Sequence, residues 1–374
     1  MTTSRTVTEA RALLRLLTEK IESLDDPGLD ELTQIEGVQW LFEYSAAMIE
    51  YYLHADPAHP VIMPMVTPFR RFLGDLRLAK HCYVARLDAA YTYRLRCEPG
   101  DAAFTSITVH ADESGGFAGN RTLGKLNHRE ITADADGSFQ VTIGPHEHGS
   151  NTITIDDSVS SLMTREFFDT DDSDRREARW SIDIIGTEPG TTVARADDTS
   201  VAHALAWAVA NLGDALPRYP RAIAAPVFVH ASINQFADFF AFDTTAVTTW
   251  GNLDALHTTM AYDLEPGHAI VIDGGPTVPC AWWGLSQNNR YLASFGRGEP
   301  TALAGRALTL DADGAWRVVL SAENPGVANW LSTAGHRNGV LRIRWMLADT
   351  TPAKPTTTVV RTEDVAGTLD RPNG

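Results

Sequence analysis

The sequence has little cysteine and no long hydrophobic run. Its three cysteines, Cys82, Cys97 and Cys280, show no CxxC spacing, so they give no zinc or redox signature and fit a reducing cytosol. No stretch approaches the ~20 consecutive apolar residues that a membrane-spanning helix needs. The N-terminal residues also lack the apolar segment and the small-residue cleavage site of a signal peptide. We therefore expect a cytoplasmic protein with no membrane span.

Basic residues are scarce as well. The chain has 31 Lys and Arg against 48 Asp and Glu, which gives a net charge of -17. This balance argues against nucleic acid as a partner, because phosphate binding depends on clusters of basic side chains. It argues equally against an anionic membrane surface. A small metabolite or a second copy of the chain is a more natural partner.

Recognised catalytic and cofactor motifs are missing. The sequence contains no P-loop, no dinucleotide-binding GxGxxG, no GxSxG nucleophile motif, no HExxH and no EF-hand loop. We therefore expect no cofactor. An enzyme without a recognised motif and a protein that only binds a ligand both stay open.

Helical patterns occur in two parts of the chain. Residues 1–70 predict two amphipathic helices, interrupted at Pro27-Gly28 and followed by a proline-rich connector. Residues 191–257 predict a helical linker. The tail, residues 351–374, is rich in Thr, Pro and Asp and is expected to be an extended, poorly packed segment.

The most informative feature is an internal repeat in the strand-like remainder of the chain. Asp134–Phe139 (DADGSF) returns as Asp311–Trp316 (DADGAW), an offset of 314 − 137 = 177 residues between their turn glycines. The same offset pairs Arg165 with Arg342 without a gap. Alternating side chains and Asp-Gly turns indicate strands and hairpins. We predict a β-rich α+β fold with two antiparallel β-sandwich or jelly-roll-like units, residues 71–190 and 258–350.

Several motifs resemble a known family. The second unit carries Gly326-Val327-Ala328-Asn329-Trp330-Leu331 and then Arg342-Ile343-Arg344-Trp345, and the first carries Ala85-Arg86-Leu87-Asp88. Together these resemble the bacterial domain of unknown function 1214. The resemblance implies a β-sandwich architecture and actinobacterial relatives placed in lipid or sterol metabolism. It transfers no catalytic residue to this chain.

The family motif and the strand after it supply the main candidate ligand-binding residues. Asn329 and Trp330 either line a pocket or hold local backbone and plug the end of the sandwich. Arg342 and Arg344 are two residues apart on a strand and share one face, where they would bind a carboxylate, phosphate or sulfate, or a protein carboxylate. Trp283 belongs to an aromatic group that forms either an apolar ligand pocket or core.

Two further histidine sites are candidates for chemistry. His336 lies in a loop between strands and is a candidate general acid or base, although no nucleophile motif accompanies it. His146 and His148 form an HxH that would hold a metal ion together with a carboxylate. The repeat replaces these two histidines with Glu323 and Pro325, so the expectation is that no metal binds.

Three functions follow from these observations. The first is a binding protein for an apolar metabolite of lipid or sterol type, with or without an anionic group. The second is a hydrolase or lyase without a recognised motif that uses His336 with Arg342 or Arg344. The third is a structural or assembly protein that forms a homo-oligomer, since tandem β-units have edge strands and dimers are the commonest assembly.

Overall fold

The computed structural model describes residues 4–73, 77–112, 121–147, 149–170, 175–186, 196–220, 232–242, 250–295, 298 and 300–369. Within these ranges the chain forms four α-helices and four β-sheets. The helices are α1 (Arg5–Leu24), α2 (Glu31–Leu53), α3 (Asp198–Ala215) and α4 (Val365–Leu369). None of them is both long enough and apolar enough to cross a membrane.

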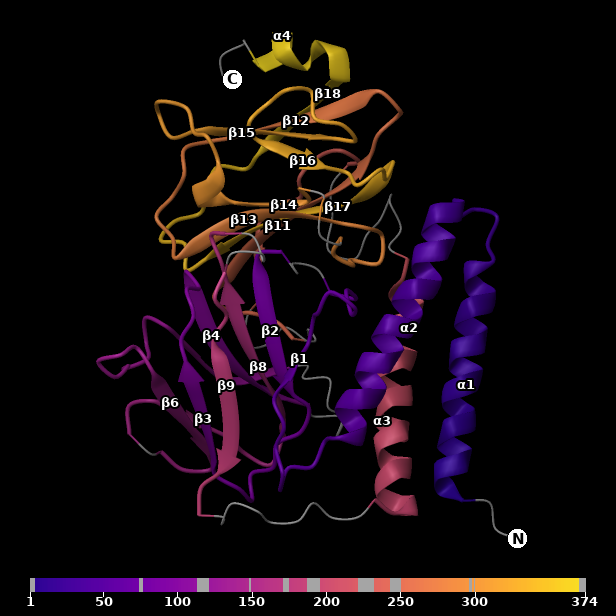
Figure 1. Ribbon diagram of the computed structural model, residues 1–374, viewed down its shortest axis with the longest axis vertical. Helices are drawn as coiled ribbons and strands as arrows, with labels where there is room; N and C mark the ends of the chain where they lie inside the picture. Colours follow the sequence, from indigo (N-terminus) through magenta and orange to yellow (C-terminus); the bar gives the residue numbers. More distant parts are fainter. Residues whose placement is uncertain are drawn as a thin grey trace.

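Two β-units follow one another along the chain and lie one above the other (Figure 1). The first contains β1 (Met63–Pro64), β2 (Ala79–Val84), β3 (Tyr93–Glu98), β4 (Phe104–Ala111), β5 (Arg121–Asn127), β6 (Phe139–Gly144), β7 (Thr152–Thr154), β8 (Val159–Phe167) and β9 (Arg179–Ile184). The second contains β10 (Phe240–Ala241), β11 (Ala255–Asp263), β12 (His268–Gly274), β13 (Trp282–Asn288), β14 (Ala302–Ala304), β15 (Trp316–Ser321), β16 (Trp330–Ser332), β17 (Asn338–Met346) and β18 (Thr356–Arg361).

The two units have the same strand order. Each has a five-stranded sheet, β1-β2-β8-β4-β5 in the first and β10-β11-β17-β13-β14 in the second. Each also has a four-stranded sheet, β7-β6-β3-β9 in the first and β16-β15-β12-β18 in the second. Arg165 lies in β8 and Arg342 in β17, the central strands of the two larger sheets. The predicted β-rich α+β fold with two repeated units is therefore confirmed.

Each unit is a sandwich whose core lies between its two sheets. In the first unit Leu95 and Val141 of the smaller sheet pack with Ile107 and Leu162 of the larger one, and all four side chains are fully buried. In the second unit Trp283 lies 5.3 Å from Trp316 and 6.0 Å from Trp345 between ring centroids. In a β-sandwich the inward-facing side chains of the two sheets pack against one another in this way.

The C-terminal region differs from the extended tail that the sequence suggests. Residues 356–361 form β18, which pairs antiparallel with β12 as β9 pairs with β3 in the first unit. Without β18, β12 would present an open edge of unpaired backbone groups. In the linker, α3 and a short 3-10 turn are the helical parts among the described residues, and Phe240–Ala241 forms a strand instead.

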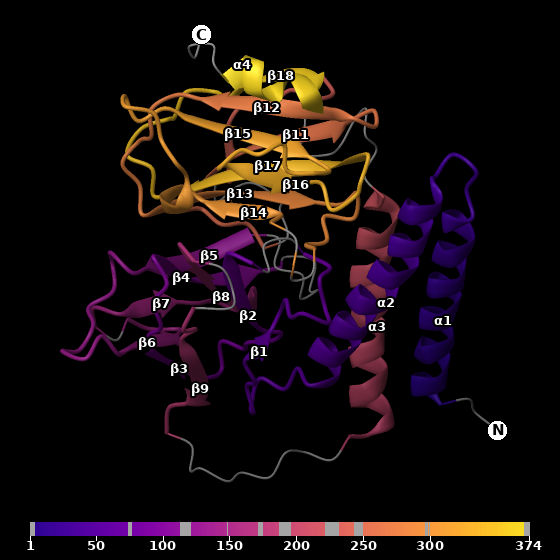
Figure 2. The ribbon, with the colours of Figure 1, turned by 45° about the horizontal axis from the view of Figure 1, so that its top comes forward.

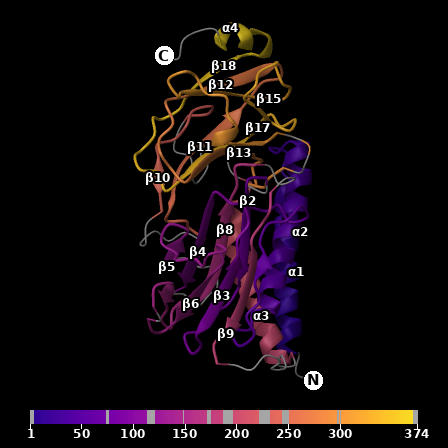
Figure 3. The same cartoon turned by 60° about the vertical axis from the view of Figure 1, so that its left-hand side comes forward.

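Three helices form a layer along one side of both units (Figures 2 and 3). The N-termini of α1 and α3 meet at Asp198, whose carboxylate accepts hydrogen bonds of 3.0 Å from the backbone nitrogens of both Arg5 and Thr6. A carboxylate at a helix N-terminus satisfies unpaired N–H groups and complements the helix dipole. A hydrogen bond from the Ser4 hydroxyl, together with those from the backbone nitrogens of Thr6 and Arg5, holds the pKa of Asp198 well below its usual range.

Helix α2 contacts both units. Near its C-terminal end the Tyr51 hydroxyl donates to the Met65 carbonyl oxygen at 3.1 Å, and the Tyr51 ring packs on Tyr83 of β2. Near its N-terminal end the Thr33 carbonyl oxygen accepts a 2.9 Å hydrogen bond from the hydroxyl of Tyr291 in the second unit. Gly37 allows that approach, since a Cβ there would overlap the Tyr291 hydroxyl and lie 2.8 Å from Leu24 Cδ2.

We predict that Gly37→Ala lowers the free energy of unfolding by about 1–3 kcal/mol, because the added methyl group overpacks the contact between α2 and Tyr291. The matched control is Gly213→Ala in α3, where a Cβ would meet no atom within 4 Å. There the better helix propensity of alanine should raise stability by up to ~1 kcal/mol. Urea denaturation measures both changes, and an unchanged or more stable Gly37→Ala variant would show that this contact is not tight.

Candidate functional site

Arg342 and Arg344 lie on the face of β17 that points away from the core of their own sandwich. Ile343 and Trp345 alternate with them and fill that core. Arg344 is buried, and its guanidinium carbon lies 5.1 Å from the ring centroid of Phe167 in the first unit. Burial lowers the pKa of Arg342 to about 10 and that of Arg344 to about 9. The two side chains therefore share a face directed at the other unit.

Arg165 holds the equivalent position in the first unit and is also buried. Its Nη1 donates to Thr108 Oγ1 at 2.8 Å, and its Nη2 donates to the carbonyl oxygens of Trp250 at 2.7 Å and Gly251 at 3.2 Å. Among the residues that the structure describes, no carboxylate forms an ion pair with Arg165. Burial lowers its pKa to about 10, while the negative charge of Asp254 opposes that shift.

Two buried histidines stand beside these arginines. His81 of β2 pairs across the strands with Arg165, and His257 of β11 pairs with Arg344. Burial, reinforced by the charges of Arg165 and Arg342, lowers the pKa of each ring to about 3. Both rings are therefore neutral at physiological pH and each presents one donor and one acceptor nitrogen.

Some polar atoms in this region have no hydrogen-bond partner among the described residues. They are His81 Nε2, His257 Nε2 and Ser106 Oγ, and Ser106 pairs with Arg165 across the strands. A buried polar atom without a partner costs about 1–3 kcal/mol, so such atoms need an explanation. We call the group formed by Arg165, Arg342, Arg344, His81, His257 and Ser106 the buried basic layer.

Aromatic and aliphatic side chains border the buried basic layer where the two units meet. Phe167 and Trp282 lie 4.7 Å apart between ring centroids and join the units, together with Phe104 and Met346. Trp282 also donates from Nε1 to the Phe168 carbonyl oxygen at 2.9 Å. The region between the two larger sheets therefore combines cationic groups with an apolar wall.

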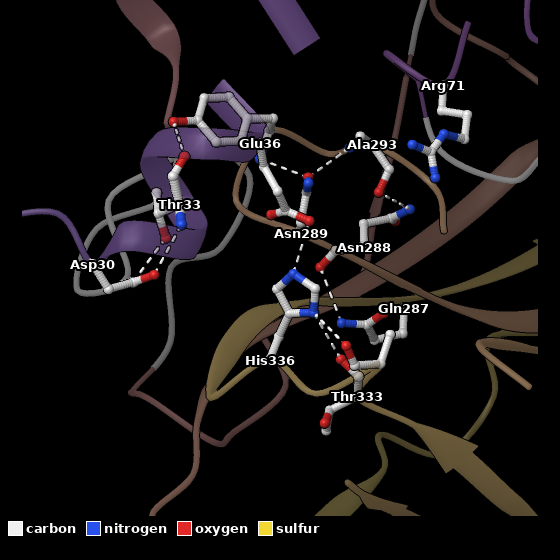
Figure 4. A network of polar contacts seen from close by, with 12 residues as sticks. Asp30, Thr33, Glu36, Arg71, Gln287, Asn288, Asn289, Ala293, Thr333 and His336 are labelled. Carbon is white, nitrogen blue, oxygen red and sulfur yellow. Dashed lines mark hydrogen bonds and ion pairs between the residues drawn. The ribbon is translucent and has the colours of Figure 1, made fainter. Parts of the chain in front are cut away.

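His336 lies in a second polar region, between α2 and the second unit (Figure 4). Its Nε2 is 2.8 Å from Glu36 Oε1, and its Nδ1 is 3.1 Å from the carbonyl oxygens of both Thr333 and Ala334. Both ring nitrogens thus face oxygen acceptors, an arrangement that suits a doubly protonated ring. Burial favours the neutral ring, but Glu36 and the two carbonyl groups outweigh it and raise the pKa of His336.

A small pocket adjoins this ion pair. Its volume is about 30 Å³, and its lining includes Glu36, Glu43, Arg71 and Ser294. Ser294 is 7 % exposed, and its Oγ has no partner among the described residues. A polar cavity of this size holds one or two water molecules but has no room for a lipid or a sterol.

Asn288 connects the two polar regions. Its Oδ1 accepts a 3.0 Å hydrogen bond from Arg342 Nε in the buried basic layer, and its Nδ2 donates to the Ala293 carbonyl oxygen at 3.4 Å. Ala293 lines the small pocket. The structure therefore connects Arg342 through Asn288 and Ala293 to the small pocket beside His336.

The other residues named from the sequence lie elsewhere. Asn329 donates from Nδ2 to the carbonyl oxygens of Thr309 at 2.7 Å and Arg317 at 2.9 Å. Trp330 donates from Nε1 to Ser321 Oγ at 3.0 Å. Trp283 lies in the sandwich core, whereas its neighbour Trp282 faces the buried basic layer. A ligand-binding role for Asn329, Trp330 and Trp283 stays a prediction.

The structure describes only one of the two histidines in the HxH candidate metal site. His146 is exposed, and His148 lies outside the described residues. No group of three or more His, Cys, Asp or Glu in the described part of the chain is arranged to hold a metal ion.

Sequence reasoning missed His81, His257 and Glu36. The first two stand in strands whose alternation is visible in the sequence, so their faces could have been assigned. Glu36 could not have been found in this way, because its partner His336 is 300 residues away in the chain.

Comparison with known proteins identifies the two repeats. The family model described as "Protein of unknown function (DUF1214)" matches residues 83–167 and 254–349, so the family suspected from the sequence is confirmed. No curated protein matches the chain. The actinobacterial relationship stays a prediction.

Two solved structures resemble the chain. An uncharacterized protein from Burkholderia cenocepacia is 23% identical with a TM-score of 0.78, and the alignment covers 96% of this chain and 97% of that one. A protein from Vibrio parahaemolyticus is 14% identical with a TM-score of 0.45, over 85% of this chain and 98% of that one. The first likeness shows that the fold, with its helices and both β-units, occurs in another protein.

The pair of His336 and Glu36 predicts a pH-dependent stability. Because the pKa of His336 is raised above its ordinary 6.5, its contribution is fully present below that value and is lost as the pH rises through the raised pKa. His336→Gln should therefore destabilise the protein more at about pH 5.5 than at about pH 9, by roughly 1 kcal/mol. Urea denaturation at the two pH values measures the difference.

The control is His54→Gln, which removes an exposed imidazole at the end of α2. This control should leave the pH dependence of unfolding unchanged. An equal loss of stability for His336→Gln at both pH values would contradict the ion pair.

Proposed function

From the geometry of a chain that belongs to the DUF1214 family, we propose that the protein binds an apolar metabolite carrying an anionic group at the buried basic layer between its two β-units. The observation that carries this proposal is the environment of Arg165. Its buried guanidinium is held by a hydroxyl and two carbonyl oxygens and by no carboxylate of the described residues. An anionic ligand would supply the counter-charge.

Electrostatics supports an anion rather than a neutral or cationic ligand. Removing a charged group from water is costly unless an opposite charge or good hydrogen bonds compensate. The buried basic layer places guanidinium groups from both repeats beside two neutral histidines, and burial lowers the pKa of all three arginines. A carboxylate offers a planar pair of oxygens that matches a guanidinium.

The surroundings of the layer support a ligand with an apolar body. Phe167, Trp282, Phe104 and Met346 border the charges where the units meet. Binding sites for small molecules commonly combine apolar walls with a few placed polar groups. A fatty-acid-like or sterol-acid-like molecule has this combination of an apolar body and one anionic end. Such a ligand would bind the protein in the cytoplasm, the compartment that we propose from the sequence.

The enzymatic alternative, a hydrolase or lyase, depends on His336. A general acid or base needs a ring nitrogen that reaches its substrate. Both nitrogens of His336 face oxygens of the protein itself, so a reaction would require the contact with Glu36 to open first. Binding without turnover is therefore our conclusion for the function. A homo-oligomer is a separate proposal that rests on a different surface.

The proposal predicts that octanoate binds and that octanamide, which has the same chain but no charge, does not. Isothermal titration calorimetry compares the two probes on the full chain. Ser106→Ala removes a hydroxyl that has no hydrogen-bond partner among the described residues, so the free energy of unfolding should stay the same. Octanoate should bind this variant about 3- to 10-fold more weakly, the cost of one hydrogen bond.

Arg165→Gln should weaken octanoate binding at least 10-fold, because it removes a charge-assisted contact. The matched control is Arg96→Gln in the same unit, since Arg96 forms an exposed ion pair with Asp183. Equal affinity for octanoate and octanamide, or unchanged octanoate affinity in the Arg165→Gln and Ser106→Ala variants, would refute the site.

A further inference from the structure

The outward face of α2 carries an exposed apolar stripe. Ile35 is 58 % exposed, Val38 37 % and Phe42 53 %. Ala46 is also exposed and Ile49 is partly exposed. The spacings between these residues are three, four, four and three, which places all of them on one side of a helix. No charged residue belongs to the stripe.

The spacing of the stripe is symmetric about Phe42. If a second α2 lies antiparallel to the first with Phe42 opposite Phe42, then Ile35 faces Ile49 of the second copy and Val38 faces Ala46. The same surface patch thus complements itself under a two-fold rotation, which is the defining property of an isologous dimer interface.

The glutamates that flank the stripe would not repel a second copy. Glu36, Glu43 and Glu50 recur every seven residues beside the stripe, and each is engaged by a cation of its own chain. Glu36 Oε1 lies 2.8 Å from His336 Nε2. The Glu43 carboxylate accepts a 2.5 Å hydrogen bond from the backbone nitrogen of Arg71 and lies 3.9 Å from the Arg71 guanidinium. Glu50 forms an ion pair with Arg70. Each of the three carboxylates thus has a basic partner in its own chain, which reduces the repulsion between two copies although the chain has a net charge of -17.

The exposed apolar area of α2 is a substantial part of what a dimer interface needs. Among the described residues, 13 large hydrophobic side chains are exposed, and five of them lie on α2. With roughly half of ~150–200 Å² exposed on each, these five present on the order of 400–500 Å², compared with ~800 Å² per partner in a standard interface.

We propose that two copies of this chain associate through antiparallel pairing of their α2 helices, with Phe42 on the two-fold axis. The association does not cover the buried basic layer of either copy, since α2 contributes its opposite face to the packing against the β-units. The dimer is thus independent of the proposed binding function.

Size-exclusion chromatography with light scattering tests the association over a hundredfold range of concentration. The wild type should have twice the chain mass of 40.8 kDa. Phe42→Glu should be a folded monomer, with a dissociation constant raised at least ~100-fold by two charges at the centre of the interface. The matched control is Phe69→Glu, since Phe69 is 86 % exposed but lies outside α2. The control should stay dimeric.

Cross-linking tests the antiparallel register. In a Cys280→Ser background the remaining cysteines, Cys82 and Cys97, are buried. A short bis-maleimide should link Phe42→Cys to itself and should link a mixture of Ile35→Cys and Ile49→Cys chains. It should not link Ile35→Cys to itself. Links of Ile35→Cys to itself would overturn the antiparallel arrangement.

Three further outcomes would overturn the proposal. They are a wild type that is monomeric at every concentration, a Phe42→Glu variant that remains dimeric, and a monomeric wild type that binds neutral lipid vesicles through the stripe. The last outcome would assign the stripe to a lipid surface instead.

Discussion

The burial of cationic groups between the two larger sheets is the constraint on which the rest of the structure depends. A guanidinium taken from water needs either a counter-charge or a full set of hydrogen bonds. Arg165 obtains its hydrogen bonds from Thr108 and from the backbone of Trp250 and Gly251, which lie near the end of the linker. The first unit, the linker and the second unit therefore depend on one another at this layer. The repeat explains its origin, because the central strand of each unit places an arginine at the same position.

Helix α2 joins this layer to the surface. Its buried face packs on both β-units, and its flanking glutamates bind His336, Arg71 and Arg70. Asn288 then connects the region of the small pocket with Arg342. A change at the outer helices can thus reach the buried basic layer through a continuous set of polar contacts. This continuity is a physical route for coupling and requires a measured effect before it is called allosteric.

Much of the fold could be predicted from the sequence, because its main features are local or repeated. Alternation placed Arg342 and Arg344 on one face, and the offset of 177 residues predicted two units of one kind. The strand formed by Thr356–Arg361 was not predicted, since its pairing with β12 joins segments far apart in the chain. The contact between His336 and Glu36 was missed for the same reason. Periodicity can assign a side chain to a face, but it does not say which distant element covers that face.

Native mass spectrometry of the wild type and the Arg165→Gln variant, each with octanoate or octanamide, tests the central claim most directly. The account predicts that each wild-type chain binds one octanoate, that octanamide does not bind, and that the Arg165→Gln variant binds octanoate at least 10-fold more weakly. A wild type whose mass does not change with octanoate, or changes equally with both probes, would contradict an anion site between the two β-units.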